Sequence, residues 1–124
     1  MGEILLTIGA IYSIGFAIFH VMFWKIFKWK TNLRSITRIN RGIMQVLNLR
    51  LIYVFLFFAY VSFFQQKALL STPLGEIVLI FISIFWLMRA TEQLIFFDRK
   101  NSVSIALTIT FAVGGGLYLI PVFC

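Results

Sequence analysis

The sequence predicts an all-α integral membrane protein: a four-helix bundle with short loops that forms a single transmembrane domain over residues 1–124. Two observations predict this class. Hydrophobic residues make up 61% of the chain and charged residues only 12%, which leaves too little polar surface to cover a water-soluble protein. The apolar residues also form four continuous runs, and each run has the roughly 20 residues that a helix needs to cross a bilayer.

We expect the four helices at about residues 4–24, 43–64, 76–97 and 103–123. Helices are favoured over strands because each apolar run is continuous, whereas a strand in a membrane barrel alternates over about ten residues. The first run has no basic residues before it and no small-residue cleavage site after it, so we expect it to stay attached. The runs lie close together along the chain, so the connections are predicted to be tight hairpins.

The basic residues predict the orientation of the chain. Eight of the eleven lie in the first and third connections: Lys25, Lys28, Lys30, Arg34, Arg38, Arg41, Arg99 and Lys100. Because positively charged loops stay in the cytoplasm, we expect these two loops there and both termini outside or in a lumen. Topology thus accounts for most of the net charge of +7, and we expect no nucleic-acid partner. The expected partner is the lipid bilayer, including its anionic headgroups.

Candidate functional residues are the polar side chains at membrane depth, where an ionisable group is costly and usually needs a partner or a watery cavity. On the second helix, four polar residues with helical spacing share a face: Arg38, Arg41, Gln45 and Asn48. Arg50 lies on a different face of that helix. On the third helix, the predicted shared face comprises Arg89, Glu92, Gln93 and Phe96. The first helix contributes His20.

These residues all lie in the half of the membrane nearer the cytoplasm. At 1.5 Å per residue, Arg50 and Arg89 lie roughly 12 Å from the cytoplasmic ends of their helices. His20, Gln45 and Glu92 lie roughly 5 to 10 Å from those ends. This asymmetry predicts a polar cavity that opens to the cytoplasm. A plainer interpretation is that Arg50 and Arg89 extend toward lipid headgroups while Glu92 neutralises Arg89.

The sequence predicts no metal site and requires no cofactor. His20 is the single histidine, so a haem held by two histidines of one chain is excluded, and no cluster has metal-site spacing. The single cysteine, Cys124, cannot form an internal disulfide. Phosphate-binding glycine loops and nucleophile elbows are absent. The run Gly114-Gly115-Gly116 predicts a close approach between helices.

Two polar runs are similar to patterns of a known family. Arg38-Ile-Asn-Arg41-Gly42-Ile-Met-Gln45 resembles a second-helix pattern of Arg, two residues, Arg, Asn, two residues and Glu. Arg89-Ala-Thr-Glu92-Gln-Leu-Ile-Phe96 resembles a third-helix Arg followed three residues later by His and seven residues later by Tyr. Both patterns belong to the MAPEG family, the membrane-associated proteins in eicosanoid and glutathione metabolism. The resemblance covers helix order, length and orientation along most of the chain.

The resemblance implies a homotrimer that binds glutathione between subunits, in a pocket open to the cytoplasm. It implies that Arg38, Arg41 and Arg89 hold carboxylates, as guanidinium groups can do in a bidentate manner. The chain departs from the pattern at Gly42, Gln45, Glu92 and Phe96, where the family has Asn, Glu, His and Tyr. Gln45 cannot neutralise the glutathione amino group, and Phe96 has no hydroxyl to donate. These departures leave open whether the chain is a glutathione-dependent transferase or peroxidase.

Three function classes are therefore consistent with the sequence. The first is a MAPEG-like protein that binds glutathione or another small anionic amphiphile in a cytoplasm-facing cleft between subunits. The second is a non-enzymatic ligand-binding or assembly protein on the same scaffold. The third is a small transporter or channel subunit, in which Arg50, Arg89 and Glu92 line a path. A continuous path would need polar groups in the outer half of the membrane as well, and the sequence offers few there.

Overall fold

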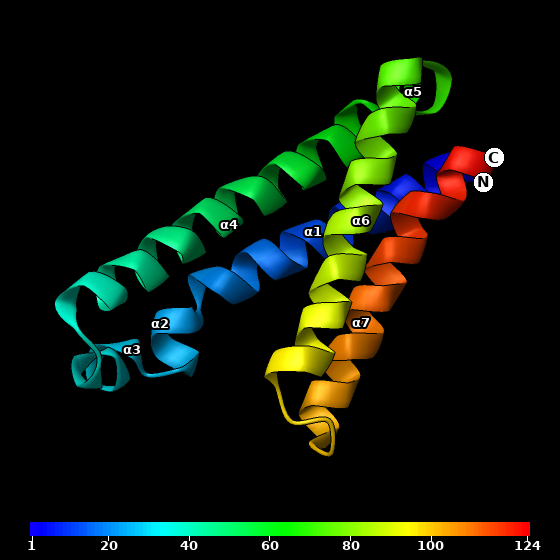
Figure 1. Cartoon of the computed structure of the whole chain (residues 1–124). Coiled ribbons are helices and arrows are strands. Elements are labelled where there is room, and N and C mark those ends of the chain that lie inside the picture. Colours follow the sequence, from blue (N-terminus) through cyan, green and yellow to red (C-terminus); the bar gives the residue numbers. More distant parts are fainter.

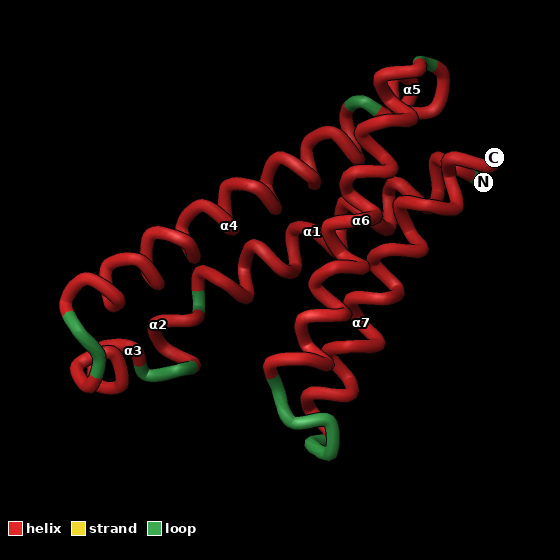
Figure 2. The backbone as a smooth tube through the Cα atoms, viewed as in Figure 1, coloured by secondary structure: helices red, strands yellow, loops and turns green.

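The computed structural model describes all 124 residues as helices joined by short loops (Figures 1 and 2). Four helices are long and apolar enough to cross a membrane: α1 (Gly2–Val21), α4 (Arg38–Phe64), α6 (Pro73–Phe96) and α7 (Ser102–Leu119). The connections hold the shorter helices α2 (Phe23–Ile26), α3 (Trp29–Asn32), η1 (Leu33–Ser35) and α5 (Gln66–Ser71), and η2 (Ile120–Phe123) extends α7. The predicted all-α class and the prediction of four helices long and apolar enough to cross a membrane are confirmed.

The second spanning helix begins five residues earlier than the sequence predicted. The side chain of Thr37 accepts a hydrogen bond from the backbone N–H of Asn40 at 3.3 Å and so caps α4 before Arg38. The predicted boundary at residue 43 followed hydropathy, whereas the helix starts where its free N–H groups find an acceptor. The 27 residues of α4 span about 40 Å, more than the ~30 Å of the hydrocarbon core, so α4 must tilt or extend beyond it.

The spanning helices pair as two hairpins. Helix α1 packs along α4, and α6 packs along α7 (Figure 1). The two hairpins meet at the end that holds α5 and both termini, which we call the closed end, and they diverge toward the other end like the arms of a V. This second end, which we call the open end, holds α2, α3, η1 and the loop of residues 97–101. The open end carries the two basic connections and is therefore the end predicted to face the cytoplasm.

A buried junction of hydroxyl groups joins the two hairpins toward the closed end. The hydroxyl oxygen of Tyr118 on α7 lies 3.0 Å from Ser13 Oγ on α1 and 2.6 Å from Ser62 Oγ on α4. All three residues are fully buried. A second bond runs from the hydroxyl of Tyr12 to the carbonyl of Thr110 at 2.7 Å. Because lipid tails are as apolar as the helix surfaces, hydrogen bonds of this kind help to decide where membrane helices meet.

Side-chain size explains why the hairpins touch at one end and separate at the other. A Cβ atom on Gly114 would collide with the ring of Tyr12, and one on Gly115 would collide with Leu87, so both glycines permit close packing. The predicted role of this glycine run is confirmed at these two positions, whereas Gly116 has open space beside it. Helix α7 continues unbroken through all three glycines. Farther toward the open end, large aromatic side chains fill the space between the helices.

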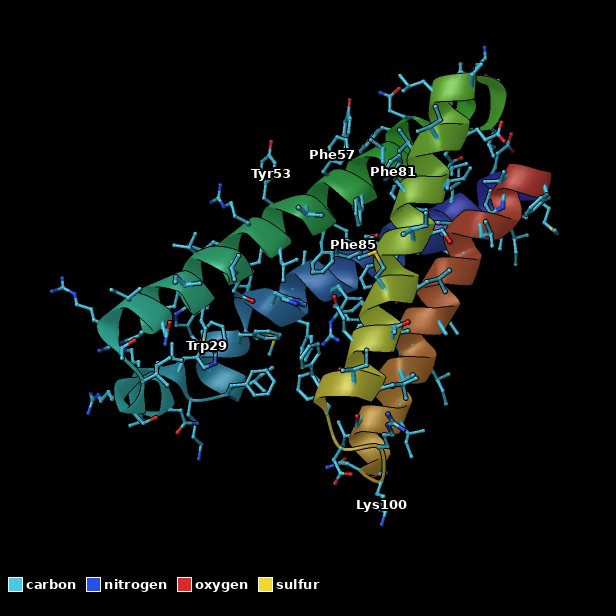
Figure 3. All side chains as sticks on the ribbon, in the orientation of Figure 1. Trp29, Tyr53, Phe57, Phe81, Phe85 and Lys100 are labelled. Carbon is cyan, nitrogen blue, oxygen red and sulfur yellow. The ribbon has the colours of Figure 1, made fainter.

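The hydroxyl junction predicts the effect of removing one oxygen atom. Tyr118→Phe keeps the ring but leaves Ser13 without its hydrogen-bond partner, so we expect the free energy of unfolding in mild detergent to fall by about 1–2 kcal/mol. Tyr53→Phe is the matched control, because Tyr53 is 68% exposed and points away from the other hairpin (Figure 3). Thermal unfolding of both variants measures the difference, and equal melting temperatures would contradict the structural role of the junction.

The glycine run predicts opposite effects for two neighbouring alanine substitutions. Gly114→Ala places a methyl group against the ring of Tyr12, so the hairpins must shift apart and the melting temperature should fall. Gly116→Ala meets nothing within 4 Å and should be neutral or stabilising by about 0.5–1 kcal/mol, because alanine favours a helix more than glycine does. A melting curve of Gly116→Ala below that of Gly114→Ala would contradict the packing described here.

Candidate functional site

A cleft of about 730 Å³ lies between the two hairpins and reaches the open end. Its lining comes from all four spanning helices, from α2 and α3, and from the loop of residues 97–101. Figure 3 shows Trp29 and Phe85 on opposite sides of the space between the hairpins, and both line the cleft. Half of the lining residues are phenylalanines or tryptophans, and the polar part consists of His20, Arg89, Gln93, Asp98, Asn101 and Ser104. A volume of this size with apolar walls and a few polar groups is typical of a ligand site.

Stacked aromatic rings close the inner part of the cleft. The indole of Trp86 on α6 lies nearly parallel to Phe55 of α4 and Phe111 of α7, with centroids 5.3 and 5.9 Å away and interplanar angles of 11° and 17°. The ring of Tyr12 on α1 meets the same indole edge-on at 4.9 Å. Trp86 is 1% exposed and therefore ties together aromatic side chains from all four spanning helices. These rings end the cleft on the side of the hydroxyl junction.

Arg89 is the single cationic side chain in the cleft lining. Its guanidinium carbon lies 4.6 Å from the ring centroid of Phe111 and 5.7 Å from that of Phe97. The attraction between a cation and an aromatic face offsets part of the cost of removing the guanidinium from water. Neither ring neutralises the charge, however, and neither accepts the N–H bonds of the guanidinium in the way an anion does. The cleft therefore presents a positive charge that an anionic group can pair with.

Two other groups on the same face of α6 lack hydrogen-bond partners. Gln93 is 2% exposed; its Nε2 donates to Ser104 Oγ at 3.0 Å, but its Oε1 accepts no bond. The indole Nε1 of Trp86 also has no acceptor. Trp86, Arg89 and Gln93 are spaced by three and four residues, which places them along one stripe of the helix. Because each buried polar group without a partner costs about 1–3 kcal/mol, this stripe is well suited to a ligand that supplies the missing bonds.

An acidic residue lies at the mouth of the cleft. Asp98 follows the end of α6, and its Oδ1 accepts a hydrogen bond from the backbone N–H of Lys100 at 2.9 Å. Asn101 lies in the same loop and caps α7 by accepting from the N–H of Val103 at 2.8 Å. Both side chains line the cleft. The cleft thus has its cation farther inside and its carboxylate nearer the open end.

His20 helps to hold the first hairpin together at the edge of the cleft. Its Nδ1 lies 2.7 Å from the carbonyl of Phe16, which can only accept, so the proton is on Nδ1. Its ring stacks on Phe23 at 4.3 Å, and its backbone carbonyl accepts a bond from Asn48 Nδ2 at 2.8 Å. The side chain of Asn48 is therefore used to join α4 to α1.

Gln45 has a similar role one turn nearer the open end. Its Oε1 accepts a bond from Trp24 Nε1 at 2.9 Å, and its Nε2 donates to the carbonyl of Arg41 at 3.2 Å. Arg41 is partly buried and its Nε has no partner. The predicted polar face of the second helix thus turns toward α2 at Gln45 and toward α1 at Asn48, where its amides join the helices.

The remaining predicted site residues lie outside the lining of the cleft. Arg38 borders a shallow depression on α4, and Glu92 borders another on α6 beside Leu87. Arg50 and Phe96 are exposed. The sequence had predicted one shared face for Glu92 and Phe96 with Arg89 and Gln93. In the structure, Arg89 and Gln93 line the cleft, whereas Glu92 and Phe96 lie outside its lining. Of the predicted site residues, His20, Arg89 and Gln93 meet in the cleft of a single chain. The predicted pocket between subunits stays a prediction.

Sequence reasoning missed three polar residues of the cleft, Asp98, Asn101 and Ser104, and its aromatic walls, with Trp86 among them. The spacing from Trp86 to Arg89 to Gln93 was a usable signal, because it follows one face of a helix. Asp98 and Asn101 had no such spacing signal, because the sequence placed both in the connection between the third and fourth helices. Their position at the mouth of the cleft depends on how α6 ends at Phe96.

Comparison with protein-family models, with curated proteins and with solved structures gives no match. The geometry of the cleft is therefore the basis for assigning a function.

Proposed function

We propose that this protein binds an anionic amphiphile in the cleft between its two hairpins. The anionic group pairs with Arg89, and the apolar chain lies along the aromatic walls and leaves the cleft between the arms of the V, into the surrounding lipid. The observation that carries this proposal is the guanidinium of Arg89, which is held over two aromatic rings in an apolar cleft and is the single cation of its lining.

Electrostatics favour an anionic ligand over a neutral one. An ionisable side chain at membrane depth is costly and generally marks a ligand or ion site. The aromatic contacts of Arg89 offset part of this cost, and an anion in a low-dielectric cleft would offset much more, because charge interactions strengthen as water is excluded. A bidentate contact to a carboxylate or phosphate also matches the planar geometry of the guanidinium.

The shape of the cleft favours an amphiphile over a water-soluble anion. Its lining is largely aromatic, and its polar groups lie on one stripe of α6 and in the loop at the mouth. An amphiphile matches both surfaces, because its tail buries apolar area while its head reaches Arg89.

The closed end favours binding over transport. There the stacked rings around Trp86 and the junction at Tyr118 pack the four helices together. A conducting path would have to pass through this packed region. The structure thus supports the ligand-binding class among the three that the sequence left open, with the ligand held inside one chain. Glutathione, which the family resemblance implies, is retained as a ligand to be tested.

The binding proposal is tested with two ligands that differ only in a phosphate group. Oleoyl lysophosphatidic acid and monoolein share an acyl chain and a glycerol, but only the first carries a phosphate. We expect the phosphate ligand to raise the melting temperature of the protein in mild detergent by about 5 °C near saturation, and monoolein to raise it much less. In Arg89→Gln this difference should disappear, because the cation of the cleft is lost.

Arg50→Gln is the matched control for this experiment, because Arg50 is exposed on α4 and lies outside the cleft. It should keep the response of the unmodified chain. Equal stabilisation by the two ligands, or an unchanged response in Arg89→Gln, would contradict the proposed function. Glutathione at millimolar concentration is run in parallel with Arg38→Ala; stabilisation that Arg38→Ala removes would favour the MAPEG-like alternative instead.

A further inference from the structure

The polar groups of the cleft follow an order along its axis. Trp86 Nε1 is a buried hydrogen-bond donor without a partner, and Arg89, three residues later on α6, carries the positive charge; both residues line the cleft. One turn toward the open end, Gln93 Oε1 is an acceptor without a partner, and the carboxylate of Asp98 lies beyond it at the mouth. Among the residues that line the cleft, the inner ones therefore supply a donor and the positive charge, and the outer ones supply an acceptor and a carboxylate; Arg99 and Lys100, which follow Asp98, lie outside the lining.

This order selects a headgroup of matching polarity. Arg89 and Gln93 are four residues apart on α6, a rise of about 6 Å. A ligand whose anionic group lies on Arg89 reaches Gln93 and Asp98 only if it continues toward the open end with a group that donates hydrogen bonds and carries positive charge. A simple fatty acid ends at its carboxylate and would leave Gln93 Oε1 without a donor. Filling that acceptor recovers a cost of about 1–3 kcal/mol.

We propose that the cleft is specific for a phospholipid whose phosphate is followed by a primary ammonium, as in phosphatidylethanolamine. This inference rests on the proposed function and names its ligand class. The phosphate accepts hydrogen bonds from Arg89 and from the indole N–H of Trp86. The ammonium donates to Gln93 Oε1 and pairs with Asp98. The acyl chains then extend from the inner cleft into the lipid, so the ligand keeps the orientation that it has in a bilayer.

Other common headgroups satisfy only part of this site. A glycerol headgroup has hydroxyl donors for Gln93 but no charge to neutralise Asp98. A choline headgroup has the charge, but its quaternary nitrogen has no N–H group and cannot donate to Gln93. Because a primary ammonium has three N–H donors and a full positive charge, it alone among these three headgroups satisfies both residues.

The test compares dioctanoyl phosphatidylethanolamine with the phosphatidylglycerol and phosphatidylcholine of the same chain length. Affinity is measured by titration of the full chain in mild detergent at about 0.3 M salt, which screens the exposed basic loops. We expect phosphatidylethanolamine to bind about tenfold more tightly than either other lipid, as one hydrogen bond to a charged group permits. Equal affinities for the three lipids would overturn the inference.

Three variants separate this inference from the proposed function. Asp98→Asn keeps an oxygen to accept from Lys100 N–H, so the loop is preserved, and it should remove most of the preference over phosphatidylglycerol. Arg89→Gln should lower the affinity of the protein for all three lipids. Glu76→Gln is the control, because Glu76 lies on α6 at the closed end, outside the cleft, and it should change neither affinity nor preference.

The outcomes are distinguishable. If all three lipids bind, depend on Arg89 and show no headgroup preference, the ammonium inference fails while the proposed function stands. If the affinity for none of the lipids depends on Arg89, both the ammonium inference and the proposed function fail. A preference for phosphatidylethanolamine that Asp98→Asn leaves unchanged would also overturn the inference, because the ammonium would then not be recognised at the mouth of the cleft.

Discussion

The hydroxyl group of Tyr118 joins the two hairpins, and the rest of the structure depends on this contact. In lipid, apolar helix surfaces have little reason to prefer one another to acyl chains, so packing and hydrogen bonds decide where helices meet. Tyr118 meets serines from both helices of the first hairpin in a fully buried position. Small residues nearby, such as Gly114, let the helices approach closely. Because contact is concentrated there, the other ends of the hairpins are left apart.

The V shape that results explains the position of the cleft and its polarity. Large rings around Trp86 fill the space where the hairpins begin to diverge, and they end the cleft on its inner side. Beyond them, the stripe of α6 that carries Arg89 and Gln93 lies beside α7 and lines the cleft: Gln93 donates to Ser104, and Arg89 lies over Phe111. These contacts leave Oε1 of Gln93 without a donor. The guanidinium of Arg89 borders the cleft, where the headgroup of an amphiphile can meet it.

The candidate site was only partly predictable, as the glutamines and asparagine at membrane depth illustrate. Gln45, Asn48 and Gln93 are all amide side chains in membrane-spanning helices, so the sequence suggests the same free-energy cost of burial for each. Gln45 accepts from Trp24 of α2, and Asn48 donates to a backbone carbonyl of α1. Asn48 and Gln93 each keep an amide oxygen without a donor, but of the two only Gln93 lines the cleft. Helical spacing identified Arg89 and Gln93 as neighbours on one face, but it did not show which face of each helix would meet another helix.

The sequence by itself determined the all-α class and the four helices long and apolar enough to cross a membrane. Hydropathy predicts such helices because it is summed over adjacent residues and does not depend on contacts with the rest of the chain. It also located the close approach at Gly114 and Gly115. Only the tertiary structure decided that the helices form two hairpins that diverge, and that Arg89 shares a cleft with Asp98 rather than a face with Glu92. Those relations depend on how each helix is rotated and where it ends, and almost uniformly apolar helix surfaces do not encode either property locally.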